Sequence, residues 1–321
     1  MEKFLACDWG TTHFRLRLVD GNTCIVLAEE KNQKGISETY SLWRQTNTRI
    51  ETRPAFYLSI INEAIRKFEK EIGLSLDHIP VVISGMASAS IGMLELPYAR
   101  LPFLIDGSGL VVQTVSSTSD FQHPVFMISG ARDENDVMRG EETQLIGASQ
   151  FSSAEEQLYI FPGTHSKHIK VKNRSAFTVK TYMTGEFFEL LSKKSILSHS
   201  IEEDKDLEEL SNKLSFEKGV ASGLSSDLLH NAFLVRTNDL FKTATKQENY
   251  YFLSGLLIGT ELSGLRNGDF PLITLVSNEA MFDLYSLALQ IAGINNIQFC
   301  NADEAIIKGQ SIILRQLTDR K

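Results

Sequence analysis

A chain of 321 residues, 42% of them hydrophobic and 22% charged, is typical of a globular protein and is long enough for two domains. Its net charge of −8 argues against general binding to nucleic acid or to an acidic membrane, although a local basic pocket could hold a small anion, and its apolar runs are too short to span a bilayer. The cysteines Cys7, Cys24 and Cys300 lack paired spacing, which favours reduced thiols in a cytoplasmic protein over a disulfide framework.

The N-terminal segment predicts a β-meander. Alternating apolar and polar residues give strands at Phe4–Asp8, His13–Val19 and Cys24–Glu30. The first turn contains Gly10, Thr11 and Thr12 and has two interpretations. These are ordinary turn residues, but glycine also lets backbone N–H groups face an anion while threonine hydroxyls add donors. The stretch alone does not decide between a plain hairpin and a phosphate-binding turn.

A helix and two short strands follow the meander. Apolar residues keep helical spacing over Ala55–Ile72, and Gly73 marks the expected end of that helix. The apolar run Pro80–Ile83 predicts a strand that leads into a loop of small residues, and Pro124–Ile128 predicts another strand. An acidic segment that begins at Gly140 then predicts the start of a further helix.

The meander recurs 153 residues later. With that constant shift Gly10 aligns with Gly163, Thr11 with Thr164 and Leu16 with Ile169. An internal duplication explains this better than a chance likeness of two hairpins, which stays open as the alternative. We expect an N-terminal domain over residues 1–154, a C-terminal domain over residues 155–321, and a hinge near Phe151–Glu155.

The rest of the chain predicts mainly helices, with a strand–helix–strand unit near the end. The expected helices are Asp204–Leu214, Phe216–Phe233, Tyr250–Leu265, Ala280–Ala292 and a closing helix from Asp303 to about Leu317; the expected strands are Pro271–Val276 and Ile297–Cys300.

Two Gly-Thr turns in two similar halves would clamp the phosphates of a nucleoside triphosphate lying between them. Asp8, directly before the first turn, would then act through Mg²⁺, because a magnesium ion on phosphate is held by one or two carboxylates. The second copy has Phe161 at this position, so a single metal-directed carboxylate is expected. The sequence contains neither a P-loop nor a G-x-G-x-x-G motif, and it lacks zinc-site spacing.

These turns, with glycine-bearing elements near the C-terminus, resemble the phosphate-1, phosphate-2 and adenosine motifs of the superfamily of sugar kinases, actin and Hsp70 chaperones. More narrowly, the chain resembles the 2-dehydro-3-deoxygalactonokinase family over nearly its whole length. The strings that carry the resemblance are CDWGTTHFR, SGMASASIGMLELPYA, DVMRGEETQLIGA, FPGTHSKHIKV, TYMTGEFFELL and FLSGLLIGTEL. The resemblance implies an α/β fold of two similar ribonuclease-H-like (actin-like ATPase) domains with a nucleotide cleft between them.

The implied reaction is ATP-dependent phosphorylation of the 6-hydroxyl of 2-dehydro-3-deoxy-D-galactonate, in galactonate breakdown. Sugar kinases carry their catalytic carboxylate at the head of a helix before the phosphate-2 hairpin, and Glu141 and Glu142 occupy that place here. We expect Glu141 to be the base and Glu142 to be the second candidate, since helix neighbours point about 100° apart. The alternative is that both glutamates only complement a helix dipole.

Further candidates surround these residues. Arginine grips a carboxylate in two places, so Arg100, Arg132 and Arg139 are candidates for the substrate's acid group, unless they form surface salt bridges. Ser84 and Ser88 either contact sugar hydroxyls or simply allow close packing. The remaining candidates are Gly163, Thr164, His165 and Lys167 for phosphate, and Gly255, Gly259, Ser277 and Asn278 for adenosine. For the last four the plainer interpretation is helix packing by the two glycines and an N-cap at Asn278.

Three other functions stay open. The chain could be another sugar kinase of the superfamily or a polyphosphate-type phosphohydrolase. It could also be a non-catalytic switch or sugar sensor that moves on binding nucleotide. The expected ligands are a small sugar acid, ATP and Mg²⁺, with no nucleic acid or membrane partner, and a homo-oligomer is compatible with the sequence. The sequence does not distinguish the stereochemistry of the sugar acid.

Overall fold

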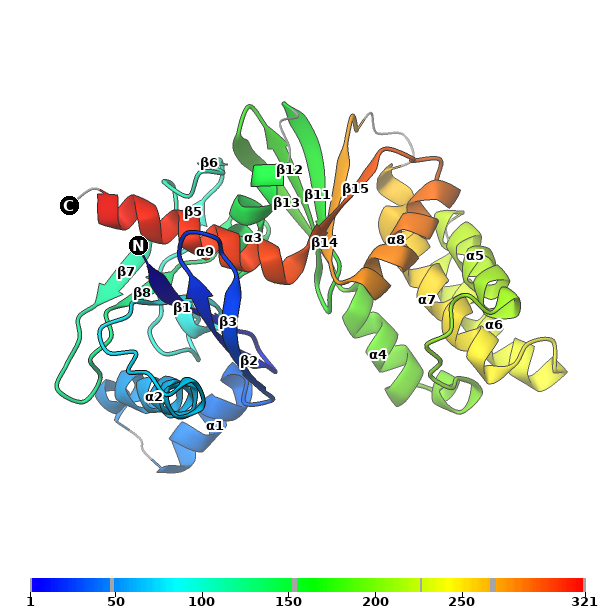
Figure 1. Ribbon diagram of the computed structural model, residues 1–321. Coiled ribbons are helices and arrows are strands. Elements are labelled where there is room, and N and C mark those ends of the chain that lie inside the picture. Colours follow the sequence, from blue (N-terminus) through cyan, green and yellow to red (C-terminus); the bar gives the residue numbers. More distant parts are fainter. Residues whose placement is uncertain (1, 47–48, 152–154, 226, 266–269, 320–321) are drawn as a thin grey trace. The chain divides into compact units, whose positions relative to one another are not determined.

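The computed structural model describes residues 2–46, 49–151, 155–225, 227–265 and 270–319 (Figure 1). The chain divides into two compact units. The first comprises Met1–Glu155, Val171–Val179 and Ala302–Lys321, and the second comprises Glu156–Lys170 and Lys180–Asn301. The first segment of the first unit ends at the boundary expected from the sequence, but this unit also takes in the last helix. Residues 152–154 of the expected hinge lie outside the described residues, and the domain assignment stays a prediction.

The first unit is built on a six-stranded sheet with the order β3-β2-β1-β4-β8-β7. Its strands are β1 Lys3–Trp9, β2 Phe14–Asp20, β3 Val26–Asn32, β4 Val81–Gly85, β7 Val112–Val115 and β8 Val125–Ile128. β1 pairs antiparallel with β2 and parallel with β4, which in turn pairs parallel with β8. The carboxyl ends of β1 and β4 therefore meet at one edge of the sheet, where Asp8 aligns with Ser84.

Helices and a small sheet complete the first unit. The helices are α1 Ile36–Thr46, α2 Arg53–Ile72, α3 Glu141–Ala148 and α9 Ala302–Asp319. The small sheet has the order β10-β9-β5, with β5 Ala99–Arg100, β9 Ala131–Arg132 and β10 Val137–Met138. Figure 1 shows α1 and α2 together beside β1–β3.

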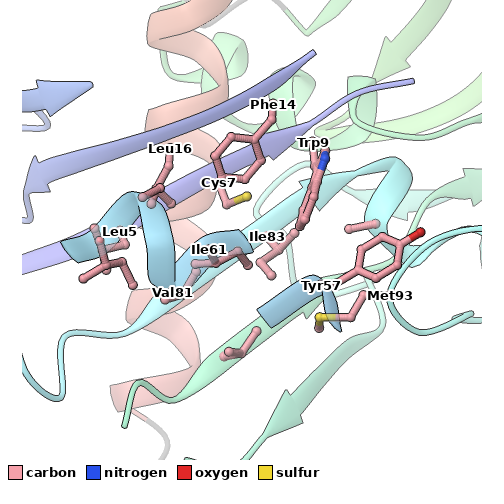
Figure 2. Close-up of a cluster of buried hydrophobic side chains, with 14 of the residues drawn as sticks. Leu5, Cys7, Trp9, Phe14, Leu16, Tyr57, Ile61, Val81, Ile83 and Met93 are labelled. Carbon is pink, nitrogen blue, oxygen red and sulfur yellow. The ribbon is translucent and has the colours of Figure 1, made fainter. Parts of the chain in front are cut away.

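The core of the first unit lies between α2 and one face of its sheet (Figure 2). Leu5, Cys7 and Trp9 of β1 are fully buried and pack with Tyr57 and Ile61 of α2. Because successive strand residues point to opposite faces, Asp8 points to the other face. α9 contacts that face, since Gln310 Nε2 donates to Ser84 Oγ at 2.8 Å. The alternation in β1 thus places an acid on the α9 side of the sheet.

A second sheet has the order β15-β14-β11-β12-β13-β6. Its strands are β6 Phe103–Leu104, β11 Glu156–Phe161, β12 Ser166–Lys172, β13 Ser175–Tyr182, β14 Ile273–Ser277 and β15 Ile297–Asn301. The run β13-β12-β11-β14-β15 repeats the run β3-β2-β1-β4-β8 of the first sheet, and β11–β14 and β14–β15 are parallel, as are β1–β4 and β4–β8. This repetition confirms the two similar α/β halves expected from the duplicated hairpin.

The helices of the second unit are α4 Thr184–Lys194, α5 Leu210–Leu224, α6 Leu228–Phe241, α7 Lys246–Leu262 and α8 Glu279–Ile291. Its core joins Leu158 and Ile160 of β11 to buried residues of α5, α7 and α8. α5 and α7 pack with their backbones in contact, since a Cβ on Gly255 would lie 2.2 Å from the carbonyl oxygen of Phe216.

Most expected strands and helices are confirmed within a few residues, but the expected helices at Asp204–Leu214 and Phe216–Phe233 are wrong. α5 begins only at Leu210, because Asp204 Oδ1 accepts the amide of Asp206 at 2.8 Å, a local bond that competes with the helix. α5 then ends at Leu224, and Asp227 has a left-handed φ of 71° before α6. Helix α1 is not among the elements expected from the sequence; its residues are mainly polar.

No helix in the described part of the chain is both long enough and apolar enough to cross a bilayer.

The packing of α3 against α9 generates a prediction about stability. A Cβ on Gly309 would lie 1.9 Å from the carbonyl oxygen of Thr143. Gly309→Ala should therefore lower the free energy of unfolding by about 1–3 kcal/mol, the usual cost of overpacking. Urea unfolding measures this loss, and Gly264→Ala is the control, because a Cβ there meets no atom within 4 Å. Equal stability of the two variants would contradict the close approach of the helices.

Candidate active site

Backbone hydrogen bonds anchor the first Gly-Thr turn, and its threonines are exposed. The amide of Gly10 donates to the carbonyl oxygen of His13 at 2.9 Å, and the carbonyls of Gly10 and Thr11 accept from the first residues of α1, at 3.0 and 3.2 Å. The side chains of Thr11 and Thr12 are exposed. Among the described residues, no backbone acceptor or side chain takes the amides of Thr11 and Thr12. The turn therefore offers two N–H donors without an acceptor in the described part of the chain, together with a threonine hydroxyl, as a phosphate site requires.

Asp8 lies directly before this turn within a cluster of charges. Its carboxylate is 3.8 Å from the Arg15 guanidinium, which also donates to Asp303 of α9 at 2.8 Å. The buried Arg17 pairs with the same Asp303 carboxylate at 3.0 Å. Burial raises the pKa of Asp8, while the charges of Arg15 and Arg17 oppose the rise. About a quarter of the side chain stays exposed.

Two glycines with positive φ bring α3 to this point. Gly85 ends β4 with a φ of 89°, and Gly140 precedes α3 with a φ of 112°. A Cβ on Gly85 would lie 2.8 Å from the Trp9 carbonyl oxygen and 3.5 Å from Asp8 Oδ1, and a Cβ on Gly140 would lie 3.6 Å from the Cα of Gly85. Only glycine adopts these angles readily in so narrow a space. The start of α3 therefore lies beside the ends of β1 and β4.

The two candidate bases differ in environment. Glu142 is fully buried, and its Oε2 accepts the Gly140 amide at 2.7 Å while Oε1 accepts the Thr143 hydroxyl at 3.1 Å. Burial, together with the charge of Glu141, raises the pKa of Glu142 to about 7. Glu141 is half-buried, and its Oε2 accepts the amide of Arg139 at 2.9 Å. The partly accessible carboxylate is thus Glu141.

The structure brings Ser88 and Arg139 together. One guanidinium nitrogen of Arg139 donates to the carbonyl and the hydroxyl of Ser88, at 2.5 and 2.6 Å, and the guanidinium lies 4.3 Å from the centre of the Tyr98 ring. Ser88 and Ser84 are both 1% exposed, and Ser84 accepts from Gln310. These contacts within the unit favour the close-packing interpretation of the two serines, and sugar contact stays a prediction.

Arg100 and Arg132 form a pair of exposed cations. They align directly on the parallel strands β5 and β9, so both side chains stand on one face of the small sheet. Within the described residues, no carboxylate lies within salt-bridge distance of either guanidinium. The alternative role of these arginines, a surface salt bridge, is therefore not seen for Arg100 or Arg132 in the described part of the chain.

The second Gly-Thr turn, in the other unit, packs against the start of α4. Gly163, Thr164 and His165 are exposed. The Thr164 carbonyl accepts from the amide of Glu186 at 3.0 Å, and His165 Nε2 lies 2.5 Å from the Glu186 carboxylate. Lys167 is buried, and its ammonium donates to Thr181 at 2.9 Å. The lysine is thus engaged inside the unit, whereas the turn itself is accessible.

The candidates for adenosine binding have structural roles. Gly255 and Gly259 lie in the α5–α7 contact, where Cβ atoms would meet the carbonyl oxygens of Phe216 and Val220 at 2.2 and 2.4 Å. Asn278 caps α8 by accepting the Met281 amide at 2.9 Å, and the buried Ser277 donates to the Asn278 carbonyl. Helix packing and capping account for all four residues, and their part in adenosine binding stays a prediction.

Sequence reasoning missed three groups that hold the site. Arg15 and Arg17 alternate along a strand, which is also what any exposed strand face shows, and Asp303 lies 288 positions from Arg15. Gln310 gives no local signal, yet its amide binds the Cys7 carbonyl beside Asp8 at 2.8 Å. Glu261 did leave a signal, because it is the only charged residue in the mainly apolar stretch 249–262 of α7.

Known proteins match this chain along nearly its whole length. A model of the 2-keto-3-deoxy-galactonokinase family matches residues 8–313. A Rhizobium meliloti (strain 1021) protein, described as a probable 2-dehydro-3-deoxygalactonokinase, is 29% identical over 98% of this chain and 97% of its own length. The 2-dehydro-3-deoxygalactonokinase of Escherichia coli (strain K12) is 29% identical over 91% of this chain and 90% of its own.

A crystal structure from Sinorhizobium meliloti, provisionally described as a 2-dehydro-3-deoxygalactonokinase, has a TM-score of 0.80 and 28% identity. The match covers 98% of this chain and 99% of that one. This likeness and the repeated strand order confirm the fold class that the sequence predicts.

The buried Glu142 carboxyl predicts a pH dependence of stability. Its pKa is about 7 in the folded protein and near 4.5 in an exposed glutamate, so its contribution is fully present below pH 4.5 and is lost as the pH rises through 7. Between pH 5 and 8 the wild type should lose about 2.5 kcal/mol relative to Glu142→Gln, which does not titrate. Urea unfolding at both pH values measures the difference. Parallel pH profiles of the two proteins would contradict the raised pKa.

Proposed function

Because the chain belongs to the 2-keto-3-deoxy-galactonokinase family, whose model matches residues 8–313, we propose that it transfers the γ-phosphoryl group of ATP to the 6-hydroxyl of 2-dehydro-3-deoxy-D-galactonate. The observation that carries this proposal is the meeting of Asp8, the first Gly-Thr turn and the Glu141 end of α3 in one unit. Phosphoryl transfer depends mainly on positioning and charge neutralisation, which these three elements can supply.

Asp8 is the residue that would hold Mg²⁺. Its Oδ1 lies beside Gly85, which has no side chain to fill the space there. Burial raises the pKa of Asp8, and a nearby divalent cation would lower that pKa again by favouring the charged carboxylate. The described residues hold no cluster of three or more metal-ligating side chains, which fits an ion bound mostly by phosphates and water with a single carboxylate. When bound, the ion would neutralise charge on the phosphates of ATP.

We assign the base role to Glu141. Glu142 is 0% exposed and both its oxygens accept local hydrogen bonds, so a substrate hydroxyl has no access to it. Glu141 stands one residue earlier at the helix start, half-buried, with its carboxylate oriented by the Arg139 amide. In the transfer, the 6-oxygen bonds to the γ-phosphorus, the bond to the β-phosphate oxygen breaks, and Glu141 takes the hydroxyl proton.

The sugar acid also brings a carboxylate, for which Arg100 and Arg132 are the best-suited residues. They are adjacent, exposed and free of acidic partners among the described residues. Arg139 is committed to Ser88 and Tyr98, so we give it the role of holding the loop before α3.

Phosphate binding is assigned to the exposed amides and hydroxyls of both Gly-Thr turns. The first turn offers the amides of Thr11 and Thr12. Lys167 is left out of this assignment, because Thr181 holds its ammonium, and the four adenosine candidates are left out because packing and capping explain them.

The proposal is tested by ADP release from purified protein with ATP, Mg²⁺ and a panel of 2-keto-3-deoxy sugar acids. We expect 2-dehydro-3-deoxy-D-galactonate to accelerate ADP release most. If nucleotide binds but no sugar acid accelerates its turnover, the kinase proposal fails and a nucleotide-dependent switch replaces it.

Glu141→Gln removes the proposed base while keeping side-chain size and the bond to the Arg139 amide. The value of kcat should fall about 10²- to 10⁴-fold, with little change in the KM for ATP. Steady-state kinetics measures both, with Glu63→Gln on the exposed face of α2 as the matched control. An unchanged kcat would remove Glu141 from the reaction.

Arg132→Gln removes one cation of the exposed pair. The KM for the sugar acid should rise on the order of 10-fold or more, because a charge-assisted bond to its carboxylate is lost, while the KM for ATP stays the same. Arg66→Gln, an exposed arginine on α2, is the control. A rise in the KM for ATP alone would move the arginine to the nucleotide.

A further inference from the structure

A fully satisfied carboxylate lies in the interior of the second unit. Glu261 of α7 is 3% exposed and accepts four hydrogen bonds from side chains. Oε1 accepts from Ser166 at 2.7 Å and from His168 at 2.8 Å, and Oε2 accepts from Tyr285 at 2.8 Å and from Thr184. A glutamate is seldom fully buried, and when it is, its oxygens need hydrogen-bond partners of this kind.

The four donors come from three elements that converge on one point. Ser166 and His168 begin β12, directly after the turn Gly163–His165. Thr184 begins α4, and Tyr285 lies in α8. The Glu261 carboxylate therefore fixes both the strand that leaves the turn and the helix that packs on it.

The backbone of the turn is in close contact with the backbone at the start of α4. A Cβ on Gly185 would lie 2.6 Å from the carbonyl oxygen of Gly163 and 2.8 Å from the Cα of Thr164. The Thr164 carbonyl also accepts from the amide of Glu186 at 3.0 Å. A shift of either Thr184 or Ser166 would therefore move the backbone amides of the turn.

Only an ionised carboxylate suits this position. Four donors need an acceptor, and a carboxylate is the side chain that accepts at both oxygens and donates at neither. Burial alone would raise the pKa of Glu261, but the hydrogen bond and charge of His168, with the Thr184 and Ser166 hydroxyls, hold that pKa below its usual value. The group thus stays charged, and its removal leaves buried donors without an acceptor.

We propose that Glu261 is a positioning residue for the second phosphate-binding turn: through Ser166 and Thr184 it holds the turn's backbone in the geometry that binds the phosphates of ATP. This inference rests on the proposed phosphate role of the turn. It assigns Glu261 no contact with substrate.

The test is Glu261→Gln, which keeps the size of the side chain and replaces one acceptor by an N–H donor. Calorimetry with MgATP and with adenosine should show an affinity for MgATP that falls on the order of 10-fold, because the phosphate donors are displaced. The affinity for adenosine, which has no phosphate, should change less than 2-fold. The same variant should raise the KM for ATP more than it lowers kcat.

Two comparisons separate positioning from general stability. Asn249→Ala removes a buried side chain of the same helix that donates to the carbonyls of Ser200 and Val235, so it should lower the melting temperature without selective loss of MgATP affinity. Ser166→Ala, next to the turn, should weaken MgATP binding more than Tyr285→Phe, which removes a donor from α8.

Binding is measured without the sugar acid, so the outcomes separate the two proposals. A wild type that binds MgATP but phosphorylates no sugar acid defeats the proposed function and leaves the Glu261 test valid. Loss of MgATP and adenosine affinity in equal measure, or a Glu261→Gln effect no larger than that of Asn249→Ala, overturns the positioning role. A wild type that binds no nucleotide overturns both.

Discussion

The close approach of Gly85 and Gly140 is the constraint on which the candidate site depends. Both glycines have positive φ, and a Cβ on Gly85 would meet the Trp9 carbonyl at 2.8 Å. Any larger residue would separate the ends of β1 and β4 from the start of α3. Helix α9 stabilises this approach, because its backbone is in contact with that of α3 and its Gln310 donates a hydrogen bond to the Cys7 carbonyl of β1. The acid of a strand end and the acids of a helix start therefore share one edge of the sheet.

Charge balance follows from that geometry. The Arg15 guanidinium lies near Asp8 but also pairs with Asp303. The negative charge of Asp8 is therefore only partly balanced, and its carboxylate can accept a further cation. Glu142 is buried without a cationic partner among the described residues and holds a proton near neutrality, which limits repulsion with Glu141. The second unit has a different arrangement of charge at its turn. Phe161 occupies the position that aligns with Asp8, and the buried Glu261 supports the turn by accepting a hydrogen bond from Ser166.

Local patterns predicted the elements well, and contacts between distant segments poorly. Alternation placed β1–β3 and their repeat, because each signal lies within a few residues. The roles of Asp8, Gly10 and Gly163 in the two turns stay predictions. The sequence order of Glu141 and Glu142 could not tell which is buried, since burial depends on the segments that pack around α3. Nor could Ser84 or Gly255 be assigned, because a small residue has the same sequence signature whether it packs against a backbone or a ligand.

In the proposed reaction, the chain places the γ-phosphoryl group of ATP on the terminal hydroxyl of a 2-keto-3-deoxy sugar acid. Phosphorus–proton correlation NMR of the product from 2-dehydro-3-deoxy-D-galactonate, ATP and Mg²⁺ tests it most directly. We expect one new phosphoester, coupled to the protons on C6, formed in equal amount with ADP. ADP and free phosphate without a sugar phosphate, or an ester at another hydroxyl, would contradict it.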